Sequence, residues 1–309
     1  MINVLRAKLA AGEFFLAPGL HDMMAARLAR EQGFDVVYGS GYWLTASCYG
    51  LPDAGIATYT QMLERMTTLK RTVGDTAVIA DADTGYGGLL NVHHTVRGYE
   101  AAGIAAIQLE DQEFPKRCGH MEGKRVIPLE DMVDKIRVAC DARGDTDGML
   151  VIARTDAIAV EGFDAALRRA EAYGNAGADI LFIEAPGSEE QMRIICRSLD
   201  KPMLANMADG GKTPILSAAE LRDIGYAGAI FPASTALAAN FATDRMLRNL
   251  KEHGTSVNAD IPLYDFQYFG RINGFDEVYA FEAKWARQAE SPRAESPRQA
   301  SGKPRNRKL

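Results

Sequence analysis

Short apolar runs alternate with helical patterns along most of the chain. Each run is followed by a polar or glycine-rich turn and then by a stretch of helical periodicity, such as residues 163–177. Several of these helical stretches end in glycine, which is a common helix stop. The eight apolar runs cover residues 14–18, 35–41, 77–83, 105–111, 149–156, 179–185, 202–207 and 228–234.

This alternation predicts a barrel. Strands that alternate with helices pair in parallel, because parallel neighbours need a crossover connection. The runs are almost continuously apolar, which suits strands that are buried on both faces. Eight such units favour a (β/α)8 TIM-type barrel over the alternative, a doubly wound open sheet. The length of 309 residues, with 47% hydrophobic and 25% charged positions, is enough for one large barrel.

The pattern changes after residue 255, so we assign residues 1–255 to the (β/α)8 barrel. Residues 256–288 are aromatic and are predicted to be helical, covering apolar surface on the barrel or on a neighbouring subunit. Residues 289–309 contain the sequence AESPR twice and few apolar side chains, which predicts a disordered, basic tail. The tail is either a solvated appendage or a weak contact for a polyanion.

Charge and cysteine content bear on partners and compartment. The net charge is −6, which gives no bulk attraction to nucleic acid or to an anionic membrane. No apolar run reaches the ~18 residues of a membrane helix, and the first residues lack the apolar core of a signal peptide. The cysteines form no CxxC pair and fit free thiols in a reducing compartment, which predicts a cytoplasmic protein. They are Cys48, Cys118, Cys140 and Cys196.

Polar residues recur where the predicted strands end. In a barrel this rim is where ligands bind. Charged groups buried there without partners would cost several kcal/mol each, so a whole set of them predicts a functional rim. The residues are Tyr38, Ser40, Asp81, Asp83, Glu110, Asp111, Arg154, Asp156, Glu184 and Asn206.

Two of these residues suggest a metal site. Asp81 and Asp83 alternate along one strand, so their side chains face the same way, and Glu110 from the next strand could join them. Three hard carboxylates without a histidine suit Mg²⁺ or Mn²⁺ better than zinc. The alternative is a pair of aspartates that cap a helix.

The sequence EDQEFPKRCGH, residues 110–120, places a thiol between cations and an imidazole. Proline and glycine make this segment a loop, which could close over the site as a lid. Neighbouring cations lower the pKa of a thiol, so Cys118 is a candidate nucleophile or proton donor. The alternative is an incidental exposed cysteine. The other cysteines are expected to be structural, Cys140 and Cys196 in helical stretches and Cys48 in a turn of small residues.

Eight short motifs follow one another in order between residues 15 and 235. They are YGSG (38–41), GLPDAG (50–55), DADTGYGG (81–88), QLEDQ (108–112), KRCGH (116–120), ARTDA (153–157), FIEAP (182–186) and LANM (204–207). They resemble the isocitrate lyase/phosphoenolpyruvate mutase superfamily, and KRCGH resembles its branch of 2-methylisocitrate and 2,3-dimethylmalate lyases. The resemblance implies a (β/α)8 barrel, dependence on Mg²⁺ with Mn²⁺ as the alternative, and a homotetramer. That tetramer would be a dimer of dimers in which C-terminal helices are exchanged between subunits.

The resemblance also implies roles for residues that match the family's motifs. Cys118 matches the catalytic acid, and Arg154 matches a residue that contacts substrate oxygens. Tyr38 matches a candidate for handling the proton of the substrate hydroxyl. The remaining matches are Lys116 and His120 beside the acid, Asp53, Asp81, Asp83 and Glu110 as metal-site acids with Asp81 as the direct ligand, and Ser40, Gly41, Arg117, Gly119, Glu184 and Asn206 as substrate-binding residues.

The implied reaction is cleavage of a 2-hydroxy di- or tricarboxylate of the 2-methylisocitrate, 2,3-dimethylmalate or alkylmalate type. The products would be an α-keto acid, pyruvate or glyoxylate, and a carboxylic acid. Phe231 and Pro232 end the last strand, where the oxaloacetate decarboxylase branch has a histidine, and they are expected to shape the pocket around the alkyl substituents. The alternatives are oxaloacetate decarboxylation, phosphonate chemistry of the phosphoenolpyruvate mutase or phosphonopyruvate hydrolase type, and a non-catalytic barrel that binds keto acids.

Overall fold

The computed structural model describes residues 3–117, 119, 121, 123–144, 148–257 and 260–289. The chain divides into two compact units, one that ends at Pro262 and one that begins at Leu263. The predicted tail, residues 289–309, lies outside the described residues apart from its first residue. Within the described part of the chain, no helix is long and apolar enough to cross a membrane.

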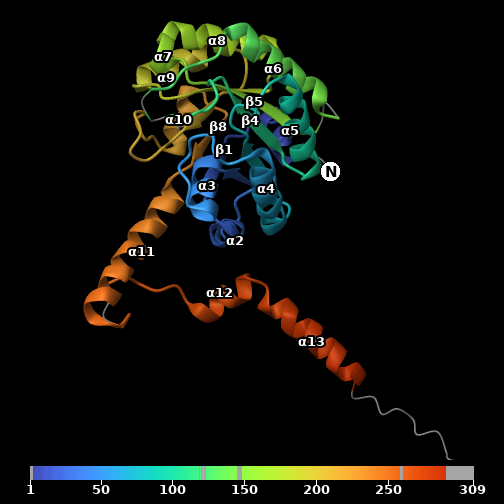
Figure 1. The fold of residues 1–309 in the computed structure, drawn as a ribbon, viewed down its shortest axis with the longest axis vertical. Helices are drawn as coiled ribbons and strands as arrows, with labels where there is room; N and C mark the ends of the chain where they lie inside the picture. The colour runs from blue at the N-terminus through green and yellow to red at the C-terminus, as the bar shows by residue number, and fades with distance from the viewer. Residues whose placement is uncertain are drawn as a thin grey trace, which may run out of the picture. The chain divides into compact units, whose positions relative to one another are not determined.

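The first unit is a barrel of eight parallel strands (Figure 1). Neighbours follow chain order from β1 to β6, and β1 also pairs with β8, which pairs with β7. A parallel bridge between Leu181 and Met203 brings the two ends of the sheet together, so the ring is nearly closed. The strands are β1 (Phe15–Leu20), β2 (Val36–Gly39), β3 (Ala77–Asp81), β4 (Ala106–Glu110), β5 (Leu150–Thr155), β6 (Ile180–Ile183), β7 (Leu204–Asn206) and β8 (Gly228–Phe231).

The predicted (β/α)8 barrel is therefore confirmed, and the doubly wound alternative is wrong, because an open doubly wound sheet would not pair its first strand with its last. All eight predicted apolar runs overlap a strand. Seven strands are shorter than their runs, whereas β1 extends two residues beyond the run over 14–18. Strand β2 ends at Gly39, because Ser40 caps a helix that begins at Gly41.

Helices surround the strands in Figure 1, and several begin at the capping residues that the sequence supplies. Thr58 and Gln61 form a reciprocal capping box, as do Ser217 and Glu220. The helices of this unit are α1 (Val4–Ala10), α2 (Met23–Glu31), α3 (Gly41–Tyr49), α4 (Tyr59–Val73), α5 (Leu89–Ala101), α6 (Leu129–Ala142), α7 (Ile158–Glu161), α8 (Phe163–Asn175), α9 (Glu189–Ser198), α10 (Ala218–Ile224) and α11 (Ser234–His253).

The core has two layers because strand side chains alternate between faces. In β2, Val36 and Tyr38 belong to a cluster inside the barrel, whereas Val37 belongs to the cluster between the strands and the helices. Leu5 of α1 is fully buried within the inner cluster. Asn3 holds this helix in place by donating hydrogen bonds to the carbonyls of Ala105 and Gly148.

The segment between β4 and α6 carries the KRCGH motif, and its base is pinned. Gln112 and Val126 form an antiparallel bridge. The amide of Ile127 donates to the carbonyl of Asp111, and the amide of Glu113 donates to the carbonyl of Arg125. The two ends of the loop over 113–124 are thus held side by side at the rim of the barrel.

The second unit contains α12 (Phe266–Ile272) and α13 (Phe275–Ala289). Helical structure was expected here from the sequence. Large side chains remain exposed on these helices in the single chain, including Phe266, Phe281 and Trp285.

The three described cysteines are free thiols, as predicted. Cys140 and Cys196 lie half-buried in α6 and α9. The prediction for Cys48 is wrong, because this residue lies in α3 and is exposed.

Candidate functional site

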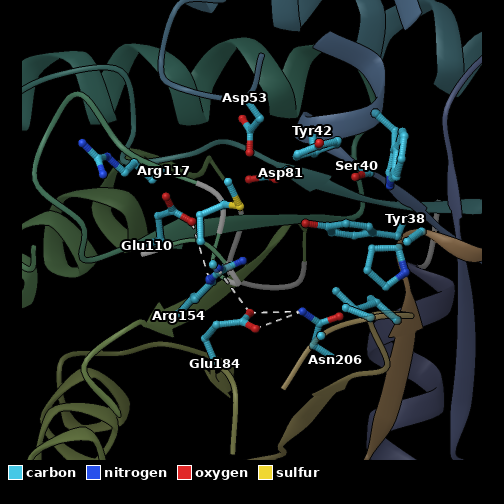
Figure 2. Close-up of a pocket in the computed structure, with 18 of the residues that line it drawn as sticks. Tyr38, Ser40, Tyr42, Asp53, Asp81, Glu110, Arg117, Arg154, Glu184 and Asn206 are labelled. Atoms are coloured by element: carbon cyan, nitrogen blue, oxygen red, sulfur yellow. Dashed lines mark hydrogen bonds and ion pairs between the residues drawn. The ribbon is translucent and has the colours of Figure 1, made fainter. Parts of the chain in front are cut away.

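A cavity of about 350 Å³ opens at the carboxyl ends of the strands. Figure 2 shows side chains from several strands converging on it. Twelve of the residues predicted from the sequence line this cavity, which supports the predicted functional rim. They are Tyr38, Ser40, Asp53, Asp81, Glu110, Lys116, Arg117, Gly119, Arg154, Glu184, Asn206 and Pro232.

Five predicted residues that the structure describes fall outside the lining, and Asp111 and Asp156 are two of them. Gly41 lies behind Asp81, and Asp83 is covered by Lys116. Phe231 packs against the apolar layer between strands and helices, so the prediction that it shapes the pocket is wrong, and of the two residues only Pro232 belongs to the lining. Cys118 and His120 lie outside the described residues.

Asp81 ends β3, and its carboxylate is fixed by backbone donors. One oxygen accepts a hydrogen bond from the amide of Asp83 (3.1 Å), and the other accepts one from the amide of Gly41 (3.2 Å). A Cβ at position 41 would lie 2.8 Å from Asp81 Oδ2, so only glycine allows this approach. Asp81 therefore has a set orientation at the cavity wall.

Lys116 stands between two carboxylates. Its Nζ lies 2.5 Å from Asp53 Oδ1 and 2.7 Å from Asp83 Oδ1, and 3% of its side chain is exposed. Although burial opposes its charge, the surrounding carboxylates raise the pKa of Lys116 well above its usual value. Burial raises the pKa of Asp83 to about 6, which Lys116 only partly opposes. Two acids that were predicted for a metal site thus neutralise a lysine in this structure.

Arg154 lies at the end of β5 and is surrounded by acids. It donates from Nε to Asp156 Oδ2 (2.9 Å) and from Nη2 to Asp156 Oδ1 (3.1 Å). Its Nη2 also lies 3.2 Å from Glu184 Oε2, and its Nε 3.5 Å from Glu110 Oε2. Burial opposes its charge, but Asp156, Glu184 and Glu110 raise its pKa well above the usual value. The guanidinium therefore stays charged at the floor of the cavity.

The opposite side of this floor is polar as well. Asn206 donates to Glu184 Oε2 (3.1 Å), which fixes the carboxylate between an amide and a guanidinium (Figure 2). Burial raises the pKa of Glu110 well above its usual value, with Arg154 opposing the shift. Glu110 Oε1 is buried and has no hydrogen-bond partner among the described residues. It is an oxygen that a further ligand could satisfy.

Tyr38 points into the cavity from β2. Its hydroxyl donates to Gln108 Oε1 at 3.4 Å, and the ring is 2% exposed. Burial, followed by the charge of Asp81, raises the pKa of Tyr38 well above its usual value. The phenol is therefore protonated near neutral pH and acts as a hydrogen-bond donor.

Some residues around the site were missed or misplaced from sequence. Tyr42, Trp43 and Asp209 line the cavity, although the sequence marks Tyr42 and Trp43 only by their place after Ser40 and Gly41. Asp111 and Asp156, predicted at the rim, point away from the cavity into a buried network. Asp111 directly follows the inward-facing Glu110, so strand alternation turns it outward, whereas Asp156 is held beneath Arg154 by the two hydrogen bonds from that guanidinium.

The carboxylates that line the cavity suit a magnesium site in which water and substrate complete the coordination of the ion. Among the described residues, no three His, Cys, Asp or Glu side chains are placed to enclose a metal ion. Mg²⁺ keeps several waters and is usually held by one or two carboxylates together with substrate oxygens. Asp81 at the cavity wall and the unpartnered Glu110 Oε1 match that requirement, and Mn²⁺ takes similar donors.

Known proteins are similar to this chain in sequence and in fold. The profile of the phosphoenolpyruvate phosphomutase family matches residues 5–251. The 2,3-dimethylmalate lyase of Eubacterium barkeri is 43% identical, over 91% of this chain and 97% of its own length. The 2-methylisocitrate lyase of Bacillus subtilis (strain 168) is 42% identical, over 90% of each. Both relatives are lyases by name.

Two solved structures are similar over most of their length. A crystal structure of 2,3-dimethylmalate lyase has a TM-score of 0.85 and 36% identity, and covers 91% of this chain and 94% of its own. A phosphonopyruvate hydrolase, crystallised with oxalate and Mg²⁺, has a TM-score of 0.81 and 32% identity, and covers 93% of this chain and 100% of its own.

We expect Lys116→Met to destabilise the metal-free protein by roughly 3–5 kcal/mol at about pH 7.5, because it leaves buried carboxylates without their cation. Folding raises the pKa of Asp83 from its ordinary 3.8 to about 6, so the ionised carboxyl opposes folding above that pH and protonation relieves it below. The stability lost in Lys116→Met should therefore be smaller at about pH 5 than at about pH 7.5. Urea unfolding in EDTA measures the free energy of unfolding at both pH values.

Lys8→Met is the matched control. Lys8 pairs with Asp35 at 2.9 Å, but the Asp35 side chain is 64% exposed. An exposed pair contributes only about 0–1 kcal/mol, so this variant should differ little from the parent at either pH. Equal losses for the two variants would contradict the account of Lys116.

Proposed function

The chain belongs to the isocitrate lyase/phosphoenolpyruvate mutase superfamily, and from that premise we propose a Mg²⁺-dependent carbon–carbon lyase. Its substrate is a 2-hydroxy di- or tricarboxylate of the 2-methylisocitrate, 2,3-dimethylmalate or alkylmalate type. The products are pyruvate or glyoxylate and a carboxylic acid. The observation that carries this proposal is the charged Arg154, held by Glu110 and Glu184 at the floor of a cavity whose wall carries Asp81.

The two ends of the substrate meet different groups. The 2-hydroxy acid end lies toward Asp81, beside Ser40 at the start of α3, where a helix N-terminus favours a carboxylate. Arg154 contacts the substrate oxygens. Glu184 and Asn206, joined by their hydrogen bond, hold the second carboxylate. Pro232 lines the side of the cavity where alkyl substituents are placed.

Asp81 would hold the metal ion directly, and Asp53, Asp83 and Glu110 would hold it through water. When bound, Mg²⁺ lowers the pKa of the substrate hydroxyl, with Mn²⁺ as a substitute. Lys116 adds a fixed positive charge beside these acids. Tyr38, protonated because it is buried, donates a hydrogen bond toward the hydroxyl oxygen.

The bond changes follow from these placements. When a base takes the hydroxyl proton, the C=O bond of the keto acid forms and the C2–C3 bond breaks. The electron pair passes to C3 and its carboxylate, and Arg154 stabilises the charge that develops there. We propose that the thiol of Cys118 then gives its proton to C3 and becomes a thiolate. Lys116, Arg117, Gly119 and His120 belong to the same loop and surround this acid in sequence.

A panel of acids tests the reaction. With Mg²⁺, we expect release of pyruvate or glyoxylate from at least one of 2-methylisocitrate, isocitrate, 2,3-dimethylmalate and alkylated malates. Lactate dehydrogenase with NADH measures the keto acid, and mass spectrometry identifies the other product. EDTA should stop the reaction, because the hydroxyl then keeps its ordinary pKa. Cys118→Ser should lower kcat by about 100-fold or more, since general acid catalysis contributes on that scale.

Oxaloacetate and phosphonopyruvate complete the panel. Turnover of either one, with no cleavage of the hydroxy acids, would replace the lyase proposal by decarboxylation or phosphonate chemistry. Cys48→Ser is the matched control, because Cys48 is exposed on α3 and lies outside the cavity lining. It should keep full activity. Retained activity in Cys118→Ser would remove the thiol from the mechanism.

We further infer a homotetramer, a dimer of dimers that exchanges C-terminal helices. Apolar side chains on α11 are exposed in the single chain, among them Phe241 (66%) and Leu247 (60%). Phe266 of α12 and the aromatic residues of α13 are exposed as well. Such surface is usually covered by another subunit.

Light scattering tests this inference. The full chain should have four times the 33.6 kDa mass of one subunit. A chain that stops after Pro262 lacks the second compact unit and should form a smaller species. A monomeric full chain, or a tetramer that survives the truncation, would contradict helix exchange.

A further inference from the structure

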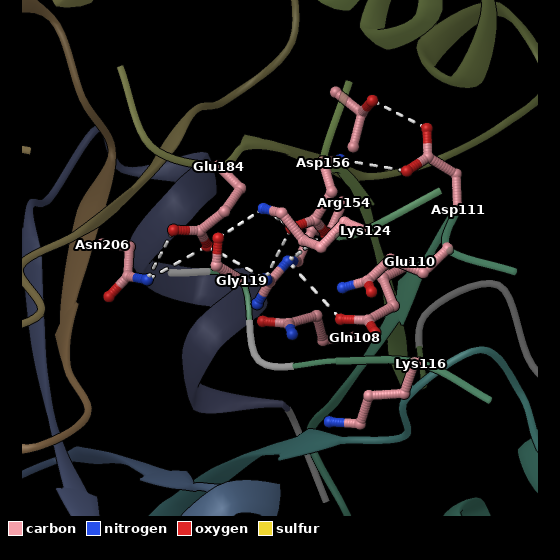
Figure 3. A network of polar contacts seen from close by, with 12 residues as sticks. Gln108, Glu110, Asp111, Lys116, Gly119, Lys124, Arg154, Asp156, Glu184 and Asn206 are labelled. Atoms are coloured by element: carbon pink, nitrogen blue, oxygen red, sulfur yellow. Dashed lines mark hydrogen bonds and ion pairs between the residues drawn. The ribbon is translucent and has the colours of Figure 1, made fainter. Parts of the chain in front are cut away.

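A second buried ion pair lies behind Arg154, outside the cavity lining. Lys124 Nζ donates to Asp156 Oδ1 at 2.8 Å, and the exposed fractions of the two side chains are 2% and 0%. Asp156 therefore holds two cations, since it also accepts both bonds from Arg154. Figure 3 shows Lys124 and Arg154 meeting at this carboxylate.

Lys124 also reaches the loop that carries the proposed acid. Its Nζ donates a short hydrogen bond to the carbonyl of Gly119 (Figure 3). Gly119 in turn lies against the floor of the cavity. A Cβ at this position would lie 2.1 Å from Arg154 Nη2 and 2.9 Å from Glu184 Cγ. Gly119 is thus as close to these groups as a glycine permits, and it directly follows Cys118 in the chain.

Asp156 is itself fixed from behind. Its amide donates to Asp111 Oδ1 at 2.9 Å. The other oxygen of Asp111 accepts from Thr155 Oγ1 (2.7 Å) and from the hydroxyl of Tyr173 (2.8 Å). Burial works against ionisation of Asp156, but Arg154 and Lys124 lower its pKa to about 2. The anchor is therefore charged and rigid at every working pH.

A role in stability alone accounts poorly for this arrangement. Replacing a buried ion pair by apolar side chains of similar size is often neutral or stabilising, so such a pair is weak evidence for stability. The bond from Lys124 to Gly119 spans five positions of a loop whose base is already pinned at Gln112 and Val126. It sets one peptide of that loop relative to Arg154.

We propose that Lys124 is a positioning residue. Anchored by Asp156, its ammonium holds Gly119 against Arg154 and Glu184, and so fixes the residue that directly follows the proposed proton donor, Cys118, in the chain. This inference rests on the proposed function, because it assigns Cys118 as the acid. It adds a residue that does not touch the substrate and acts through Gly119.

The test compares two lysine variants. Lys124→Met should lower kcat by about 30–100-fold, the scale of a misplacement near 1 Å, while KM changes little because the binding residues keep their places. Lys70→Met is the control, since Lys70 also donates to two backbone carbonyls, those of Gly74 (2.7 Å) and Thr76 (3.0 Å), far from the cavity lining. It should lose stability and keep kcat.

A second readout needs no turnover. The rate at which iodoacetamide alkylates Cys118, followed by mass spectrometry of its peptide, should change at least about threefold in Lys124→Met and stay constant in Lys70→Met. If no substrate is turned over, the proposed function fails, yet this rate still tests the positioning. An unchanged kcat, or an unchanged alkylation rate where there is no turnover, would overturn the proposal.

A double-mutant cycle tests whether Lys124 acts through its anchor. Asp156→Asn should also lower kcat, and adding Lys124→Met to it should cost little more. Additive losses would overturn the proposed coupling. Should Lys124→Met fail to fold, Lys124→Gln, which is shorter and uncharged but polar, should show the same loss of kcat. Failure of both variants to fold would show that the pair serves stability, and would overturn the proposal.

Discussion

The site depends on one buried guanidinium. Arg154 can stay charged beneath the cavity because Asp156, Glu184 and Glu110 compensate it. Removing Arg154 would take the cation away from three buried carboxylates, which costs several kcal/mol. The rest of the site follows from this requirement, because each of these acids comes from the end of a different strand or from the residue after it. Strands β4, β5 and β6 are parallel neighbours, so their carboxyl ends lie together at the rim.

Charge is balanced separately on two sides of the cavity. Lys116 forms ion pairs with Asp53 and Asp83. Arg154 forms ion pairs with Glu110, Glu184 and Asp156. Asp81 stands between these groups and is held by backbone amides. A 2-hydroxy acid substrate would face the carboxylate of Asp81 at the cavity wall, and a divalent cation could bind both. At the floor it would face the positive charge of Arg154, which can stabilise a developing carbanion. The two halves of the proposed reaction thus need different sides of one cavity.

Much of this could be predicted from sequence, because barrel strands give strong signals. Nearly continuous apolar runs such as residues 149–156 mark the strands, and polar residues directly after them mark the rim. The direction in which individual side chains point was harder to predict. Asp81 ends its strand, and Asp111 and Asp156 come directly after theirs. Asp111 and Asp156 nevertheless turn into the layer behind the rim, where Tyr173 and Lys124 donate to them.

Other parts of the site depend on contacts between distant segments, which no local pattern reports. Lys124 looks like an ordinary loop cation in the sequence, and only the fold shows its bonds to Asp156 and Gly119. Phe231 and Pro232 are adjacent, but the alternation of the strand turns one into the apolar layer and the other into the cavity.

The central claim is that Asp81 and Arg154 together bind a keto-acid chelate of a divalent cation. Calorimetric titration of the protein with oxalate, in Mg²⁺ and in EDTA, tests it most directly. The account predicts binding in Mg²⁺, none in EDTA, and loss of the Mg²⁺-dependent binding in Asp81→Asn. Equal affinity for oxalate in EDTA and in Mg²⁺ would contradict it, because the cavity would then bind the dianion through its cations alone.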